Sequence, residues 1–333
     1  MRSVAIIKPD HVGDLVLAVP AINWVATQSS KVTLFVRTAN VSLAQYLFPG
    51  LQIEAMDFPH LNKGARGNSS SLQDCLKPAT GHDVAVILRT DHVFNRERLH
   101  HLLGPCVFSD SRDDRHESTG HRFGLRVYFG DYESEPYWTG CKKPFPPAPK
   151  TIGLCVGSGF PTNKWSVIRW VELGRRLMAR GCQIRLIGGL QERQELALLS
   201  ETMGLNSSAI IEGGRNIAEL LAAVAQTDVV IASDGGAGHL CSLAAPVLTV
   251  AASVPFRRFA PFGCGNRVVS MDLPCSPCMN AHDTHMNICF SHECSYGITV
   301  EAVLTALDAG QQSPGSINPL DRGAKLFHAV SHA

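Results

Sequence analysis

Short apolar runs alternate with amphipathic segments along most of the chain, a pattern typical of a parallel α/β sheet. The apolar run at residues 3–7 leads through a glycine loop into residues 14–27, whose apolar positions recur at helical spacing. Pro20 should kink or interrupt that helix near its start. The same patterns predict strands at 31–36, 52–56 and 84–88 and a short helix at 42–47.

Three stretches of the first half break this pattern. Residues 62–80 are polar and rich in Gly and Ser, which predicts a mobile loop rather than an element. Residues 109–130 carry many charges without a clear period, so they form either an acceptor-facing loop or, more commonly for a charge run, a solvated surface. Residues 137–150 contain four prolines and can continue neither a helix nor an inner strand, which predicts an interdomain linker.

The alternation restarts after this linker. We expect strands at 151–156, 183–187, 209–211 and 228–232, and helices at 167–180, 192–203, 217–225 and 299–307. The chain therefore divides into two Rossmann-like domains, residues 1–145 and 146–310, and a tail at 311–333 that packs back or stays mobile. A cleft is expected between the domains, where the carboxyl ends of both sheets could face one another.

Composition narrows the class of protein. The chain has 333 residues, of which 45% are hydrophobic and 18% charged, and its net charge is +1. These values argue against disorder and against a basic face for nucleic acid. Because no run of roughly twenty apolar residues and no signal peptide occur, we expect a soluble cytoplasmic protein. A peripheral contact with a membrane is compatible with this expectation.

The most informative stretch is the bend within residues 229–263. An apolar run ends in Ser233-Asp234, and the small residues 235–238 and His239 follow before the next apolar run. In open α/β sheets ligands bind outside the carboxyl ends of the strands, where small residues let backbone N–H groups approach an anion. The bend is therefore a candidate donor site for a phosphate-containing ligand.

Three further loops at strand ends carry candidate groups. Asp14 could accept the proton of an attacking hydroxyl, although aspartate equally well caps a helix. Ser158 and Lys164 could hold a diphosphate, the alternative being a solvated loop lysine. Glu192 could bind a ribose diol, the alternative being a surface glutamate at a helix start.

Together these residues carry a resemblance to a known family. The opening loop and helix at 8–21, in which Gly13-Asp14 precedes an apolar stretch ending in Pro-Ala, resemble those of glycosyltransferase family 9, the bacterial heptosyltransferases. Residues 233–240 resemble that family's Asp-Ser-Gly-Pro-x-His-Leu signature. The resemblance implies a GT-B fold and transfer of a sugar from a nucleotide-diphosphate donor to a hydroxyl.

The resemblance also implies the roles of individual residues. Asp14 would be the catalytic base, and the donor, expected to be ADP-heptose, would be bound by Ser158, Lys164, Glu192, Asp234, Gly235, Gly236, Gly238 and His239. Because positive charge and helix-end dipoles can stabilise the leaving diphosphate, the chemistry should need no metal cofactor. The expected acceptor is a cell-surface glycan or lipopolysaccharide core.

The chain departs from the family pattern at two points. Lys164 stands next to Trp165, whereas the family's lysine usually stands two residues before the tryptophan. Gly235 and Ala237 replace the usual Ser and Pro, which removes one hydroxyl from the donor loop. Three alternatives stay open: a protein O-heptosyltransferase of the same family, a nucleotide-sugar epimerase, and a non-catalytic nucleotide-sugar-binding protein. The acceptor could accordingly be a glycan, a lipid-linked glycan or a protein.

A cysteine cluster lies in the loop at 275–294. The chain has eleven cysteines, and four of them form a CxxC followed by two further thiols: Cys275, Cys278, Cys289 and Cys294. Four thiolates at this spacing can reach a tetrahedral Zn or Fe ion, and disulfides or free thiols are the alternatives. A site saturated by thiolates would be structural. Some members of the resembled family, including protein-heptosylating ones, have a similar cysteine-rich segment and hold iron.

Overall fold

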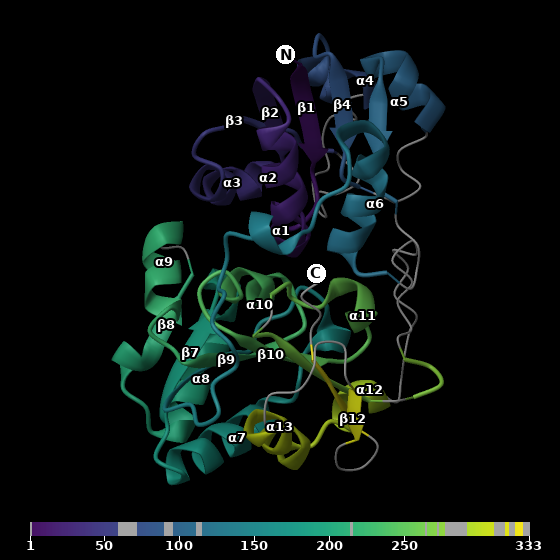
Figure 1. Ribbon diagram of the computed structural model, residues 1–333. Coiled ribbons are helices and arrows are strands. Elements are labelled where there is room, and N and C mark those ends of the chain that lie inside the picture. The colour runs from purple at the N-terminus through teal and green to yellow at the C-terminus, as the bar shows by residue number, and fades with distance from the viewer. Residues whose placement is uncertain are drawn as a thin grey trace. The chain divides into compact units, whose positions relative to one another are not determined.

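The computed structural model of the chain describes residues 2–58, 72–89, 96–110, 115–213, 216–263, 265–271, 273–276, 292–309, 317–319 and 324–328. These residues form two compact units, which divide between Thr139 and Gly140 (Figure 1). The sequence predicts the boundary between residues 145 and 146, within the same proline-rich segment. None of the helices in these ranges has both the length and the apolar character needed to cross a membrane.

The first unit is built on a parallel five-stranded sheet of order β3-β2-β1-β4-β5. The central strand β1 is buried along nearly its whole length because it pairs on both sides and is covered on both faces. The strands are β1 (Ser3–Lys8), β2 (Lys31–Val36), β3 (Gln52–Ala55), β4 (Val84–Ile87) and β5 (Cys106–Phe108).

The first helical segment of this unit breaks where the proline predicts. Helix α1 ends at Leu17, and Pro20 occupies the first turn of α2, where a missing backbone N–H leaves no helical bond unmade. The helices of the unit are α1 (Val12–Leu17), α2 (Val19–Thr27), α3 (Val41–Leu47), α4 (Leu72–Leu76), α5 (Arg96–Leu103) and α6 (Glu117–Phe129), with 3₁₀ turns η1 (Thr38–Asn40), η3 (Lys77–Ala79) and η4 (Glu135–Tyr137).

Two predictions for this unit are wrong. The expected loop at 62–80 contains α4 and η3, since Leu76 and Ala79 pack into the core; residues 59–71 lie outside the described residues. The stretch at 109–130 contains the helix α6, whose buried positions include Ser118, Gly120 and His121. Small and polar residues on the buried face hide the helical period that apolar residues would show.

The second unit is built on an eight-stranded sheet of order β12-β13-β11-β10-β9-β6-β7-β8. The six strands from β6 to β11 are parallel, and β12 and β13 add an antiparallel edge, so this part of the tail packs back onto the sheet. The strands are β6 (Thr151–Cys155), β7 (Gln183–Gly188), β8 (Ile210–Glu212), β9 (Val229–Ser233), β10 (Val247–Ala251), β11 (Arg267–Met271), β12 (Ile317–Pro319) and β13 (Ala324–His328).

Helices contribute to two separate cores of the second unit. Trp170 of α7, Leu199 of α8 and Val303 of α13 belong to one core, and Val224 of α9 and Cys241 of α10 belong to another. The helices are α7 (Val167–Ala179), α8 (Arg193–Met203), α9 (Ile217–Val224), α10 (Gly236–Cys241), α11 (Phe256–Phe259), α12 (Glu293–Tyr296) and α13 (Val300–Asp308), with 3₁₀ turns η5 (Pro161–Asn163), η6 (Leu190–Glu192) and η7 (Ser207–Ala209).

Candidate functional site

Charged side chains gather at the carboxyl edge of the first unit's sheet. Lys8, the last residue of β1, forms an ion pair with Asp10, with Nζ 2.9 Å from Oδ2, and donates a hydrogen bond of 2.6 Å to the carbonyl of Leu88 after β4. Arg89 approaches the other carboxylate oxygen of Asp10 with Nη1 at 2.8 Å. Parallel strands bring these groups together because their carboxyl ends meet at one edge of the sheet.

The predicted base, Asp14, lies half-buried beside this network in the first turn of α1. Its Oδ2 accepts a hydrogen bond of 3.2 Å from the backbone N–H of His11, so the carboxylate does help to cap its helix. Burial raises the pKa of Asp14 to about 6, and repulsion from Asp10 adds to this effect, while attraction to Lys8 opposes it. A carboxylate whose pKa approaches the working pH suits a general base, so capping and catalysis are compatible.

Sequence reasoning missed Glu117, a third acid near Asp14. Glu117 is buried in the first turn of α6, and its charge raises the pKa of both Asp14 and Lys8. It lies in the charged stretch whose helix the period did not reveal. In the sequence, Glu117 shows only as a single acid at the start of a helix, and such acids are common on protein surfaces.

In the second unit, the loops that follow β6 and β9 are joined by side-chain hydrogen bonds. Ser158 donates from Oγ to the carbonyl of Asp234 at 2.8 Å, and Ser233 donates from Oγ to the carbonyl of Val156 at 3.1 Å. Because β6 and β9 are neighbours, the predicted Ser158 and Asp234 loops lie side by side. A Cβ at Gly235 would stand 3.3 Å from Ser158 Oγ, so this position leaves little room for a larger residue.

Asp234 carries a buried carboxylate in this bend. It is 6% exposed, and burial raises its pKa from 3.8 to about 7. Its Oδ2 makes no hydrogen bond to any residue that the structure describes. A buried carboxylate oxygen without a hydrogen-bond donor is costly, and such an open acceptor is expected where a ligand supplies the donor.

The remaining residues of the bend form the short helix α10, which starts at Gly236. His239 is buried within it, and the backbone N–H of Gly238 donates to the carbonyl of Gly235 at 3.1 Å. A Cβ at Gly238 would lie 3.2 Å from that of Ala232, so the glycine allows the helix to pack closely on β9.

Glu192 lies against the Ser158 loop. Its Oε2 accepts a hydrogen bond of 2.9 Å from the backbone N–H of Gly189, and a Cβ at Gly157 would stand 2.8 Å from its Cδ. The structure thus brings Glu192, Ser158 and Asp234 to adjoining loops, as expected for residues that contact one ligand.

Lys164 forms an ion pair with a carboxylate, whereas a phosphate-binding lysine must be able to contact the phosphate. Its Nζ lies 3.0 Å from Oε2 of Glu195, on the first turn of α8. Sequence reasoning missed Glu195, although its spacing of three residues from Glu192 places both acids on one side of the helix start. A diphosphate would have to exchange with Glu195 to engage this ammonium.

The metal site at the four cysteines stays a prediction. Cys275 is exposed after β11 and Cys294 is buried in α12, whereas Cys278 and Cys289 lie outside the described residues. Within the described ranges, no group of three or more His, Cys, Asp and Glu side chains is arranged to hold a metal ion.

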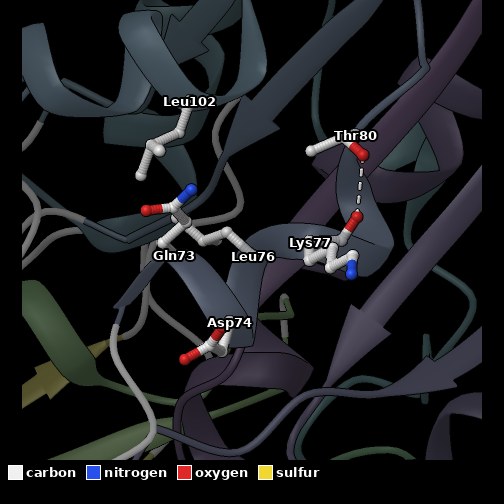
Figure 2. A pocket seen from close by; sticks show the side chains of 6 residues that line it. All are labelled: Gln73, Asp74, Leu76, Lys77, Thr80 and Leu102. Atoms are coloured by element: carbon white, nitrogen blue, oxygen red, sulfur yellow. Dashed lines mark hydrogen bonds between the residues drawn. The ribbon is translucent and has the colours of Figure 1, made fainter.

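A cavity of about 250 Å³ in the first unit is separate from these groups (Figure 2). It lies beside η3, where Thr80 donates from Oγ1 to the carbonyl of Lys77 at 2.8 Å. None of the predicted site residues lines it; the lining consists of Gln73, Asp74, Leu76, Lys77, Thr80 and Leu102.

Residues 133–288 match the sequence model of glycosyltransferase family 9 (heptosyltransferase). This stretch, which contains every predicted donor residue, therefore belongs to the family that the motifs resemble, and the predicted family is confirmed. A curated relative, lipopolysaccharide heptosyltransferase 1 of Pseudomonas aeruginosa, is 28% identical over 142 residues. That alignment covers 42% of this chain and 39% of the relative, so it spans well under half of the relative's length.

Solved structures of the family share the fold. ADP-heptose lps heptosyltransferase II of E. coli superposes with a TM-score of 0.61 at 15% identity, over 92% of this chain and 98% of that one. The iron-containing dodecameric glycosyltransferase TibC of enterotoxigenic E. coli H10407 gives a TM-score of 0.57 at 14% identity, over 92% and 76% of the two chains. The predicted α/β fold of GT-B type is confirmed.

Proposed function

We propose that the chain is a heptosyltransferase-like glycosyltransferase that moves a sugar from a nucleotide-diphosphate donor to a hydroxyl group. The observation that carries the proposal is the buried carboxylate of Asp234, whose Oδ2 has no described partner, in a bend that belongs to the family 9 match. We further propose ADP-heptose as the donor and a lipopolysaccharide core or related surface glycan as the acceptor. The name of the Pseudomonas relative supports this choice.

In the proposed reaction, Asp14 of the first unit removes the proton of the acceptor hydroxyl. The hydroxyl oxygen then bonds to the anomeric carbon of the donor sugar, and the bond from that carbon to the diphosphate breaks. A base with a pKa of about 6 is mostly ionised at pH 7 and still has useful proton affinity.

The second unit stabilises the leaving nucleoside diphosphate in this scheme. Ser158 already donates its hydroxyl to Asp234, so we assign it the task of fixing the loop, and the backbone N–H groups of the loop contact the phosphates. Lys164 exchanges Glu195 for the diphosphate and neutralises charge that develops on it. Glu192 binds the ribose diol. In this scheme the transfer needs no metal ion.

The test combines ADP release, mass spectrometry of the acceptor and binding of ADP. Asp14→Asn should reduce transfer to heptose-deficient lipopolysaccharide core by at least about a hundredfold, because general-base catalysis contributes that much or more. It should leave the affinity for ADP within a factor of about two, since the donor residues are in the second unit. Asp74→Asn, an exposed aspartate of the same unit, is the matched control and should retain full activity.

Other outcomes identify the alternatives. Interconversion of the donor sugar without an acceptor would indicate an epimerase, and ADP binding without turnover would indicate a non-catalytic binding protein. Heptose added to a protein instead of the glycan would keep the reaction but replace the acceptor. An Asp14→Asn variant with undiminished transfer would remove Asp14 from the mechanism.

A further inference from the structure

The strongest feature outside the proposed roles is the ion-paired carboxylate of Asp10. Two cations form ion pairs with it, one on each carboxylate oxygen: Nζ of Lys8 lies 2.9 Å from Oδ2, and Nη1 of Arg89 lies 2.8 Å from Oδ1. The side chains of Lys8, Asp10 and Arg89 are only 2%, 12% and 9% exposed. Because these ion pairs are largely shielded from water, removal of one partner would leave an uncompensated buried charge.

The position of Asp10 is fixed by neighbouring segments of the sheet edge. Its backbone carbonyl accepts a hydrogen bond of 2.9 Å from Nδ2 of Asn40, at the end of η1. Lys8 is fixed in turn by its hydrogen bond to the carbonyl of Leu88. The loop that leads into α1 is therefore anchored to the segments that follow β2 and β4.

This arrangement has an electrostatic consequence for Asp14. Lys8 and Arg89 both favour the ionised form of Asp14, whereas Asp10 and Glu117 disfavour it. Without the carboxylate of Asp10, the two buried cations would have Asp14 as a nearby counter-ion and would draw it toward themselves. A base held in such ion pairs is weaker and is turned away from an incoming hydroxyl.

We propose that Asp10 is a positioning residue for the glycosyl transfer: by binding Lys8 and Arg89, it keeps both cations from pairing with Asp14 and leaves that carboxylate available to the acceptor. The inference rests on the proposed function for the role of Asp14. The placement of the charges themselves is independent of it.

The first experiment does not require turnover. The full-length protein is labelled with ¹³C at aspartate side chains, and the Asp14 signal is identified by its loss in Asp14→Asn. In Asp10→Asn the titration midpoint of the Asp14 carboxyl should fall by about one pH unit or more, since two cations then act on it alone. In Arg89→Met the midpoint should rise, because one of the attracting charges is gone.

The proposal requires that the titration midpoint of Asp14 moves in opposite directions in these two variants. An unchanged or higher midpoint in Asp10→Asn, or displacements of the same sign in both variants, overturns it. Asp10→Glu keeps the charge and should stay close to the unmodified protein. The ¹H–¹³C methyl spectrum of each variant verifies that the unit is folded, and where Arg89→Met does not fold, Arg89→Gln replaces it with the same upward displacement expected.

The second experiment follows kcat for ADP release against pH. In Asp10→Asn the acid limb should move down with the NMR midpoint, and the plateau should fall roughly threefold or more as the base weakens. KM for the donor should stay unchanged. A plateau loss with an unmoved limb overturns the proposal. If the unmodified protein has no transferase activity, the proposed function fails, while the NMR titration still decides whether Asp10 controls Asp14.

Discussion

The buried carboxylate of Asp234 makes a prediction about stability that is separate from its role in donor binding. Replacing Asp234 with asparagine keeps the size and shape of the side chain and removes its ionisation. We expect Asp234→Asn to be more stable than the unmodified protein at neutral and alkaline pH, although it binds the donor less well. Stability gained at the expense of a ligand contact is typical of binding sites.

The magnitude follows from the pKa of Asp234, which burial raises from 3.8 to about 7. One pKa unit corresponds to about 1.4 kcal/mol, so the difference of about three pKa units amounts to about 4 kcal/mol. Between pH 4 and 7 the folded state holds one more proton than the unfolded state, so the free energy of unfolding falls as pH rises. The full penalty is present above pH 7 and absent below pH 4.

The assay is urea unfolding of both proteins at several pH values between 4 and 8, followed by tryptophan fluorescence, to which Trp165 and Trp170 of the second unit contribute. The stability difference should be near zero at pH 4 and approach about 4 kcal/mol at pH 8. Asp228→Asn is the control, because the Oδ2 of Asp228 accepts hydrogen bonds of 2.7 and 2.8 Å from the backbone N–H groups of Lys150 and Thr151. It should be destabilising. Parallel pH dependences of the unmodified protein and Asp234→Asn would refute the reasoning.

Two further predictions concern the second unit. Gly157→Ala should weaken ADP binding by about tenfold with little loss of stability, because its Cβ would displace the carboxyl of Glu192. In Gly159→Ala the new Cβ meets nothing within 4 Å, so isothermal titration should find unchanged affinity; equal effects in both variants would contradict the assignment of Glu192. Elemental analysis of protein never exposed to a nickel column should find close to one Zn or Fe per chain and a clear loss in Cys275→Ser, whereas less than about half an equivalent would argue against the cluster.

The strands were predictable because most of them are buried on both faces. Runs of β-branched and aliphatic residues such as those of β1, β2 and β9 have few alternatives, and their order along the chain implies parallel pairing. The proximity of the Ser158 and Asp234 loops was predictable for the same reason, since both loops stand at the carboxyl ends of adjacent strands.

What could not be predicted depends on contacts between residues distant in sequence. The helix α6 buries Ser118 and His121, and a Cβ at its Gly124 would clash with the carbonyl of Phe108. Its buried face therefore consists of small and polar residues that allow close packing, and it lacks the apolar period of an amphipathic helix. The ion pair of Asp10 with Arg89 joins residues from the loops that follow β1 and β4. Periodicity and local motifs do not show which charged residues form ion pairs with one another.

The antiparallel pair β12 and β13 has a consequence for the behaviour of the protein in the test tube. By pairing with β11, β13 covers backbone groups of Val268 and Val269 that would otherwise form an open sheet edge. The new edge strand, β12, is three residues long and contains Pro319, which has no N–H to offer another chain. A protein shortened at residue 316 would therefore present a longer, apolar edge and should self-associate, so a purification tag is better placed at the other terminus.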